Sequence, residues 1–168
     1  TAWQPEAMEV SYEDSKAFWK DQGYATHSPL WLKEIGGKRP DFASYLYYMR
    51  LRIHALYRVL KPTGSIYLHC DDKASHYLRM IMDERFGWEN FRNEIIWCYH
   101  GGGVATHQYK RKHDTVLFYT KSDKYLFHPV VLPREKPKFY RAGIPVASSG
   151  KILEDWWDDL PSRGTATN

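Results

Sequence analysis

The chain has 168 residues, of which 43% are hydrophobic and 16% aromatic, and its formal net charge is +4. This length and composition suffice for one domain with a buried core and exclude a disordered or fibrous chain. No apolar run reaches the roughly 18 residues of a membrane span, and only two cysteines are present, so we expect a soluble, cytoplasmic protein without a disulfide.

Residues 1–40 form an N-terminal segment, which we call the preface, and their sequence shows no strand pattern. Helical character is expected over residues 11–21, and Ser28-Pro29 is expected to open a second short helix that ends at Gly36-Gly37. Two roles stay open for this preface, an active-site lid and a packed extension.

Two predicted helices frame a predicted strand in the next segment. Apolar residues recur at every third or fourth position from Leu46 to Leu60, which predicts a helix in the segment that starts at Asp41, and residues 65–70 follow as a short, mostly apolar strand. The second helix covers residues 74–86 and ends at Gly87. Its core stripe consists of Leu78, Ile81, Met82 and Phe86.

Three more strands are predicted after these helices. Residues 94–99 read as a buried strand that runs into three consecutive glycines. Another strand covers residues 115–119, and a turn at residues 121–124 leads into a return strand at residues 125–127, which makes a hairpin. The alternation of helices and strands predicts an α/β fold.

Polar residues cluster where the first predicted strand ends. His69, Cys70 and Asp71 stand at this point of the sequence. Ligands bind beyond the carboxyl ends of the strands in open α/β sheets. We therefore expect His69 and Asp71 to lie at a functional edge of the sheet.

The segment from residue 104 to residue 141 is strongly basic. It contains nine lysines and arginines against three acidic residues, and several tyrosines and a phenylalanine are interleaved with them. Such a segment attracts phosphates and offers stacking surfaces, which favours contact with nucleic acid. A solvated basic face is the alternative interpretation.

Three segments of the chain resemble, in order, the amino-directed DNA methyltransferases that modify adenine N6 or cytosine N4. These three segments read VLKPTGSIYLHCDDKASHYL, FGWENFRNEIIWCY and RKHDTVLFYTKSDKY. A fourth segment that resembles the family, LEDWWDDLP, lies within residues 152–161. The order resembles the circularly permuted branch, in which the catalytic motif precedes the cofactor-binding motif. The resemblance implies a partial class I, Rossmann-like methyltransferase sheet with helices on its faces and an edge hairpin.

Two motifs of that family are absent from these 168 residues. One is the Asp/Asn-Pro-Pro-Tyr/Phe tetrapeptide that holds the target amine, and the other is the Phe-x-Gly-x-Gly loop that approaches S-adenosylmethionine. We therefore expect a central piece of a longer enzyme, inactive by itself and without a catalytic residue of its own. The intact enzyme would methylate double-stranded DNA, and the overall likeness favours adenine N6.

The resemblance also assigns segments and side chains. Residues 1–40 would be the preface or lid, 41–128 the catalytic-core segment, 129–151 an irregular basic segment for DNA recognition, and 152–168 a return segment towards the cofactor-binding half. Trp97 and Tyr99 are candidates for the pocket of the extruded base. The candidates for DNA phosphate contact are Lys110, Arg111, Lys112, Lys136, Lys138 and Arg141.

Strand alternation should point Trp97 and Tyr99 to one side of the sheet and Cys98 to the other. Several alternatives stay open. His69, Cys70 and Cys98 are donors that zinc uses, although no paired metal-binding motif is present. A non-catalytic nucleic-acid-binding module would keep the basic surface without the chemistry. A homodimer and a restriction-subunit partner are both compatible with the sequence.

Overall fold

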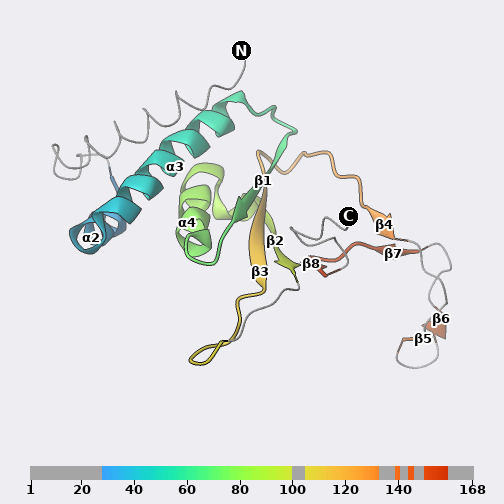
Figure 1. The fold of residues 1–168 in the computed structure, drawn as a ribbon. Coiled ribbons are helices and arrows are strands. Elements are labelled where there is room, and N and C mark those ends of the chain that lie inside the picture. The colour runs from blue at the N-terminus through green and yellow to red at the C-terminus, as the bar shows by residue number, and fades with distance from the viewer. Residues whose placement is uncertain (1–27, 100–104, 133–138, 141–143, 146–149, 159–168) are drawn as a thin grey trace, which may run out of the picture. The chain divides into compact units, whose positions relative to one another are not determined.

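The computed structural model describes residues 28–99, 105–132, 139–140, 144–145 and 150–158. The chain divides into two compact units, Thr1–Lys61 with Lys73–Phe91 and Pro62–Asp72 with Arg92–Asn168. We call them the helical unit and the sheet unit, after the elements they hold (Figure 1). The helix predicted over residues 11–21 lies outside the described residues, and the four predicted segment boundaries stay predictions.

The helical unit contains α2 (Leu30–Lys38), α3 (Pro40–Val59), α4 (Ser75–Phe86) and the short 3-10 helix η1 (Trp88–Asn90). These bounds confirm the helix predicted from the apolar pattern of residues 46–60, which begins at Pro40, and the helix predicted over residues 74–86. Helix α4 ends at Gly87, whose φ of 86° is a backbone conformation that favours glycine.

The predicted end of α2 at Gly36-Gly37 is wrong, because the helix continues through both glycines to Lys38. Its last turn is closed by the Arg39 N–H, which donates to the Ile35 carbonyl at 2.7 Å. Arg39 itself is not helical, with φ −141° and ψ 71°, since a residue that precedes proline is disfavoured in the helical conformation. Pro40 therefore separates α2 from α3, and the glycines do not.

The predicted core stripe of α4 is confirmed. All four of its residues are at most 3% exposed, namely Leu78, Ile81, Met82 and Phe86. Helix α3 adds Leu46 and Ile53, both fully buried, whereas Leu56 of the same helix is 45% exposed. Burying one such side chain contributes about 1.5–3 kcal/mol. The Phe86 ring also packs edge-on against Tyr57, with ring centroids 5.0 Å apart.

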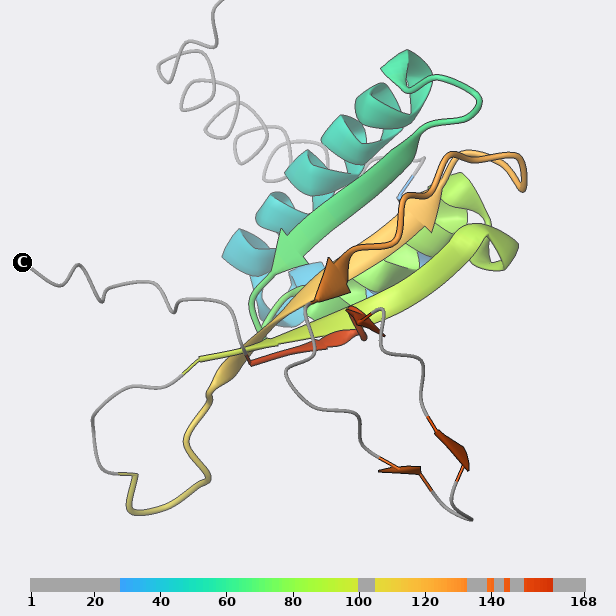
Figure 2. The ribbon, with the colours of Figure 1, turned by 90° about the vertical axis from the view of Figure 1, so that its right-hand side faces the viewer.

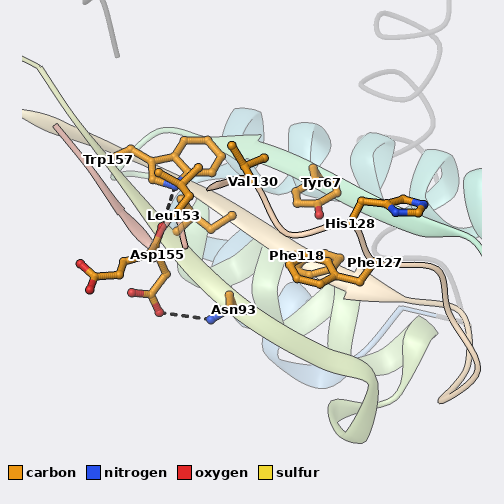
Figure 3. Close-up of a pocket in the computed structure, with 11 residues that line it drawn as sticks. Tyr67, Asn93, Phe118, Phe127, His128, Val130, Leu153, Asp155 and Trp157 are labelled. Atoms are coloured by element: carbon orange, nitrogen blue, oxygen red, sulfur yellow. Dashed lines mark hydrogen bonds between the residues drawn. The ribbon is translucent and has the colours of Figure 1, made fainter. Parts of the chain in front are cut away.

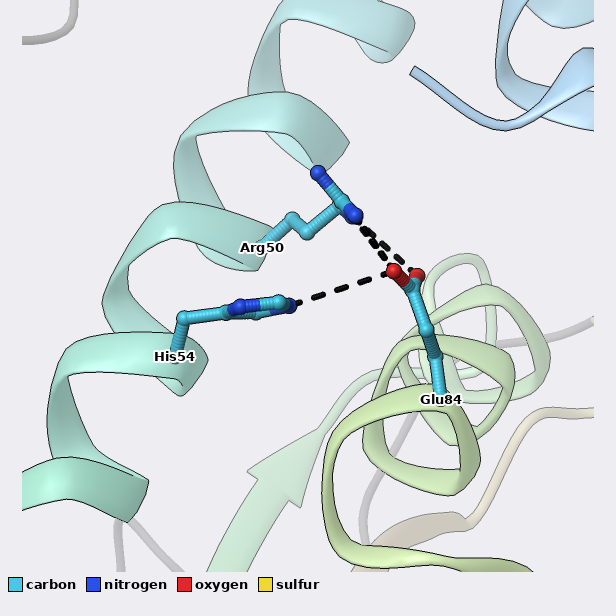
Figure 4. A network of polar contacts seen from close by, with 3 residues as sticks. All are labelled: Arg50, His54 and Glu84. Carbon is cyan, nitrogen blue, oxygen red and sulfur yellow. Dashed lines mark hydrogen bonds and ion pairs between the residues drawn. The ribbon is translucent and has the colours of Figure 1, made fainter. Parts of the chain in front are cut away.

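A charged network joins α3 to α4 within the helical unit (Figure 4). The Arg50 guanidinium donates to both carboxylate oxygens of Glu84, with distances of 3.2 and 3.1 Å from Nε, and forms an ion pair with it through Nη2. His54 Nε2 lies 4.0 Å from the same carboxylate. The bond from Arg50 lowers the pKa of Glu84, and desolvation by burial, followed by the Arg50 charge, lowers the pKa of His54.

These shifts predict that the helical unit loses stability in acid. Unfolded His54 takes up a proton near its ordinary pKa of 6.5, whereas the folded protein resists that proton, so stability falls as pH falls below about 6.5. Thermal unfolding should therefore show a smaller drop in Tm between pH 7 and pH 5 for His54→Gln than for the wild type, by on the order of a few degrees. An equal drop in both proteins would contradict the role of His54. The exposed His76 of α4 provides the matched control, His76→Gln.

The sheet unit contains a four-stranded sheet in the order β1-β3-β2-β8, formed by β1 (Ser65–Cys70), β2 (Phe91–Cys98), β3 (His113–Thr120) and β8 (Trp156–Trp157). Strands β1 and β3 are antiparallel, with Ser65 opposite Thr120 and Cys70 opposite Thr115. Strand β8 is parallel to β2, and Figure 2 shows β3 running back beside β2. The sheet is therefore mixed, and the predicted α/β class is confirmed.

The predicted return strand at residues 125–127 is wrong, because this segment is not a strand. Both edges of β3 are already paired, with β1 on one side and β2 on the other. The segment instead packs through its side chains, since the Tyr125 ring meets Phe118 edge-on at 6.3 Å and Phe127 stacks on Phe118 at 6.0 Å. The hairpin partner of β3 is β2, and β3 lies inside the described sheet.

Two short ribbons complete the sheet unit. One pairs β4 (Val131–Leu132) with β7 (Lys151–Ile152), and the other pairs β5 (Phe139–Tyr140) with β6 (Ile144–Pro145). Gly150 has a φ of 115°, and a Cβ at this position would lie 2.7 Å from the Leu132 carbonyl oxygen. None of the helices in the described ranges combines the length and the apolar character needed to span a membrane.

Candidate functional site

A pocket of about 500 Å³ opens on one face of the sheet unit (Figure 3). Strand alternation places its floor, because Tyr67 of β1 stands opposite Phe118 of β3 in the register. Ile95 of β2 and Trp157 of β8 extend this floor across the sheet. The remaining wall comes from Phe127, His128, Val130 and Leu153.

Aromatic rings dominate one end of the pocket. Tyr67 and Phe118 stack with centroids 4.4 Å apart and an interplanar angle of 7°. Phe118 is 4% exposed and belongs to a small core with Ile95 and Val116. Tyr67, in contrast, is 51% exposed, and Phe127 is 54% exposed. This end therefore presents stacked rings to solvent above a buried core.

Acidic residues occupy the other end of the pocket, near β8. The Asn93 amide donates to Asp155 Oδ2 at 3.1 Å, and the Trp157 indole N–H donates to the Glu154 carbonyl at 2.8 Å. The Ile96 N–H donates to the Asp155 carbonyl at 2.8 Å. These bonds anchor the residues before β8 against β2, and they leave the Glu154 and Asp155 carboxylates exposed.

A second cluster lies at the end of β1, and alternation places it on the same face of the sheet as the pocket. His69 Nε2 and Asp114 Oδ2 are 2.9 Å apart, and the His69 and Trp97 rings have centroids 5.7 Å apart. The Tyr99 hydroxyl hydrogen-bonds to Asp114, and burial, with the nearby carboxylates, raises the pKa of Tyr99. We call His69, Trp97, Tyr99 and Asp114 the strand-end cluster.

The Trp97 indole is the unusual member of this cluster. Its Nε1 atom is buried and finds no hydrogen-bond acceptor among the described residues. A buried N–H without an acceptor costs about 1–3 kcal/mol. It is therefore a donor available to a group outside the described part of the chain.

Basic residues adjoin the strand-end cluster at the start of β3. Arg111 forms an ion pair with Asp72 at 2.9 Å, and the Lys112 carbonyl accepts the Tyr99 N–H at 3.0 Å. Lys110 is exposed, as is Asp71 at the end of β1. The remaining predicted phosphate contacts, Lys136, Lys138 and Arg141, lie outside the described residues.

The predicted alternation of β2 is confirmed. Trp97 contacts the His69 ring, whereas Cys98 Sγ accepts the Trp156 indole N–H at 2.7 Å on the opposite side of the strand. In the described ranges, no three histidine, cysteine or acidic side chains converge in a way that could hold a metal ion. His69 and Cys70, which the metal alternative required together, alternate along β1.

The sequence predicted His69 at a functional edge of the sheet and Trp97 and Tyr99 in a base pocket, and the structure brings these three side chains together with Asp114. The sequence did not identify Asp114, nor the pocket formed by Tyr67, Phe118, Phe127 and Trp157. The period of two in β1 and β3, which turns Tyr67 and Phe118 each to one face of its strand, was a signal for the floor. Phe127 and Trp157 could not be placed there from sequence, because their positions depend on loop paths and on the pairing of β8 with β2.

The two cysteines should differ strongly in reactivity. Cys70 is 3% exposed, and burial raises the pKa of its thiol to about 12, whereas Cys98 is only partly buried. At pH 8 the thiolate fraction of Cys70 should be about a thousandfold smaller than that of an ordinary cysteine. Peptide mass spectrometry after iodoacetamide treatment should find Cys98 alkylated first. Equal labelling of the native protein would contradict this, and equal labelling in denaturant is the control.

Comparisons with known proteins give a consistent result. The family model described as DNA methylase, which covers N6 and N4 methyltransferases, matches residues 12–166. The Type II methyltransferase M.HpaI of Haemophilus parainfluenzae is 32% identical over 102 residues, which are 61% of this chain and 32% of that protein. M.BglII of Bacillus subtilis is 29% identical over 142 residues, which are 76% of this chain and 39% of that protein.

A relative of another class is also similar. The Mod subunit of the type III restriction-modification enzyme StyLTI of Salmonella typhimurium is 36% identical over 66 residues, which are 39% of this chain and 10% of that protein. The chain spans about a third of the length of the type II relatives it matches.

Proposed function

This chain belongs to the DNA methylase family of N6-adenine and N4-cytosine methyltransferases, and we propose that the full protein transfers a methyl group from S-adenosylmethionine to an exocyclic amine of a DNA base. Its α/β fold with a four-stranded mixed sheet is consistent with the Rossmann-like methyltransferase fold. Adenine N6 is the target that we propose.

S-adenosylmethionine supplies an electrophilic methyl group on a sulfonium when it is bound. The described residues include no glycine-rich loop at a strand end, which is the feature that allows a cofactor to approach the backbone. We therefore assign none of them to holding the cofactor. The role of this chain in the proposed reaction is to bind the base and the DNA.

The strand-end cluster is the proposed site of the target base, and the buried Trp97 N–H is the observation that carries this proposal. Enzymes that modify a base extrude it from the helix and hold it by stacking and by hydrogen bonds. Trp97 and Tyr99 supply aromatic surface, and the Trp97 N–H supplies a donor for a ring nitrogen. The bond to Asp114 fixes the orientation of the His69 ring, so that His69 and Asp71 form the polar side of the site.

The basic residues beside the cluster are proposed to hold the DNA backbone. The Lys112 backbone bonds to Tyr99, Arg111 pairs with Asp72, and Lys110 precedes them in the chain. We propose that these three residues neutralise phosphates next to an extruded base. We extend this role to Lys136, Lys138 and Arg141. The substrate would be double-stranded DNA.

A restriction-modification role in the cytoplasm follows as a proposal from the relatives. Two of them are named as type II methyltransferases, and another as a Mod subunit of a type III restriction-modification enzyme. A restriction subunit or a second copy of the protein is the partner that such a role implies.

The first test measures transfer of labelled methyl groups from S-adenosylmethionine into mixed-sequence DNA. It compares this chain with the same chain extended in both directions through its natural reading frame. Label should enter DNA with the extended protein, and digestion of the product should yield N6-methyladenine. No label from either protein, together with salt-sensitive DNA binding, would favour the non-catalytic nucleic-acid-binding module.

In the extended protein, Trp97→Leu should lower kcat/KM for methyl transfer about tenfold or more. The reason is that stacking of a base on an aromatic ring contributes about 1–3 kcal/mol. Trp88→Leu is the matched control, because Trp88 is 77% exposed in the helical unit. Equal rates for the two variants would contradict the assignment of Trp97 to the base site.

The DNA contact has its own test. Lys110→Ala should weaken binding to all DNA sequences alike and should reduce the slope of log K against log salt by about 1, since one phosphate contact is lost. Fluorescence anisotropy with a labelled duplex at several salt concentrations measures this slope. Lys61→Ala, at an exposed lysine of the helical unit, is the control. An unchanged slope in Lys110→Ala would remove Lys110 from the interface.

A further inference from the structure

The carboxylate of Asp114 holds side chains from both neighbours of its strand, because β3 lies between β1 and β2. His69 of β1 stands opposite Val116, so Asp114, two residues earlier, is the diagonal neighbour of His69 on the same face. His69 Nε2 lies 2.9 Å from Asp114 Oδ2, and the hydroxyl of Tyr99, the residue after β2, bonds to the same carboxylate. These two bonds hold the carboxylate in one orientation.

The chemistry of a carboxylate decides which ring nitrogen of His69 carries the hydrogen. Carboxylate oxygens accept hydrogen bonds and donate none, so the nitrogen that meets Asp114 is the donor, Nε2–H. In a neutral imidazole the other nitrogen, Nδ1, then has an unshared electron pair and is an acceptor. The bond to Asp114 therefore selects one tautomer of the His69 ring and makes Nδ1 an acceptor.

This acceptor is open to a ligand. Nδ1 makes no hydrogen bond to any of the described residues, and 39% of the His69 side chain is exposed. Arg111 forms its ion pair with Asp72 and so does not occupy Asp114. The Trp97 ring borders the same place, with its centroid 5.7 Å from that of His69. The His69 ring therefore presents an oriented acceptor beside an aromatic side chain of the proposed base site.

We propose that Asp114 is a positioning residue, which holds His69 in the tautomer whose Nδ1 accepts an N–H of the extruded base. This inference rests on the proposed function, since it takes the base as the ligand of the site. The exocyclic amine is the group of the base that supplies such an N–H. A bond from the amine to Nδ1 holds the amine in one direction, which contributes to the rate because reacting atoms must be aligned. Asp114 acts only through His69.

The tautomer can be measured without any methyl transfer. In the extended protein, a nitrogen isotope label in the histidine rings gives NMR signals whose shifts report which nitrogen carries the hydrogen. The wild type should show His69 as the Nε2–H tautomer. Asp114→Asn should show the Nδ1–H tautomer, since an amide N–H donates to Nε2. His69→Gln identifies the signals of His69, and the exposed His76 of α4 is the control whose tautomer should not respond.

Two substitutions separate the two nitrogens of His69. His69→Gln keeps a donor at the ε position for Asp114 but has no acceptor at the δ position, whereas His69→Asn keeps the δ acceptor and loses the donor. His69→Gln and Asp114→Asn should each lower kcat for methyl transfer about tenfold, and His69→Asn should lower it less. A purely structural role in holding Asp114 predicts the opposite order for the two His69 variants. His76→Gln, in the helical unit, should leave kcat unchanged.

Three outcomes would overturn the proposal. A wild-type His69 in the Nδ1–H tautomer would mean that Nδ1 is not an acceptor, and an unchanged tautomer in Asp114→Asn would mean that Asp114 does not select it. A lower kcat for His69→Asn than for His69→Gln would reduce His69 to a structural partner of Asp114. The signals of the other histidines report whether each variant is folded.

Failure of the proposed function is distinguishable from these outcomes. A wild-type extended protein that transfers no methyl group to DNA would remove the base as the ligand of Nδ1. The same protein would still give the tautomer of His69, so the role of Asp114 in selecting it would be decided by the NMR measurement alone.

Discussion

Six consecutive residue pairs between β1 and β3 decide which side chains meet on the face of the sheet that carries the pocket and the strand-end cluster. We call it the working face. In this register Tyr67 lies opposite Phe118, and His69 lies opposite Val116. A slip of one residue would turn every side chain of a strand to the other face. The pocket and the strand-end cluster both depend on this pairing. The buried residues Thr115–Thr120 of β3 hold it in place, because a slip would bring their polar and apolar members into the wrong environments.

The working face holds two different groups of side chains, one at the strand-end cluster and one at the pocket. Around the strand-end cluster, Arg111 forms an ion pair with Asp72, and the His69 ring is hydrogen-bonded to Asp114. Around the pocket, the carboxylates stand beside aromatic rings.

Much of the secondary structure was predictable, because local signals agreed with the fold. The apolar stripe of α4 and the glycine that ends it were sufficient to predict that helix, and a short, mostly apolar run was sufficient to predict β1. The failures have particular physical causes. Gly36-Gly37 did not end α2, since Pro40 ends it three residues after Gly37. Residues 125–127 did not form a strand, since no edge of β3 was free to pair with them. Which strand pairs with an edge of β3 cannot be predicted from the local sequence pattern of one segment.

By itself the sequence determined the element types, the class of fold, the family resemblance and the alternation that sets Trp97 against Cys98. Only the tertiary structure decided that Asp114 holds His69, that Asp72 holds Arg111, and that Phe127 and Trp157 reach one pocket from segments 30 residues apart. The physical reason is the range of the forces. Helix and strand preferences act between near neighbours, whereas pairing, stacking and ion pairs join residues that only the folded chain brings within contact distance.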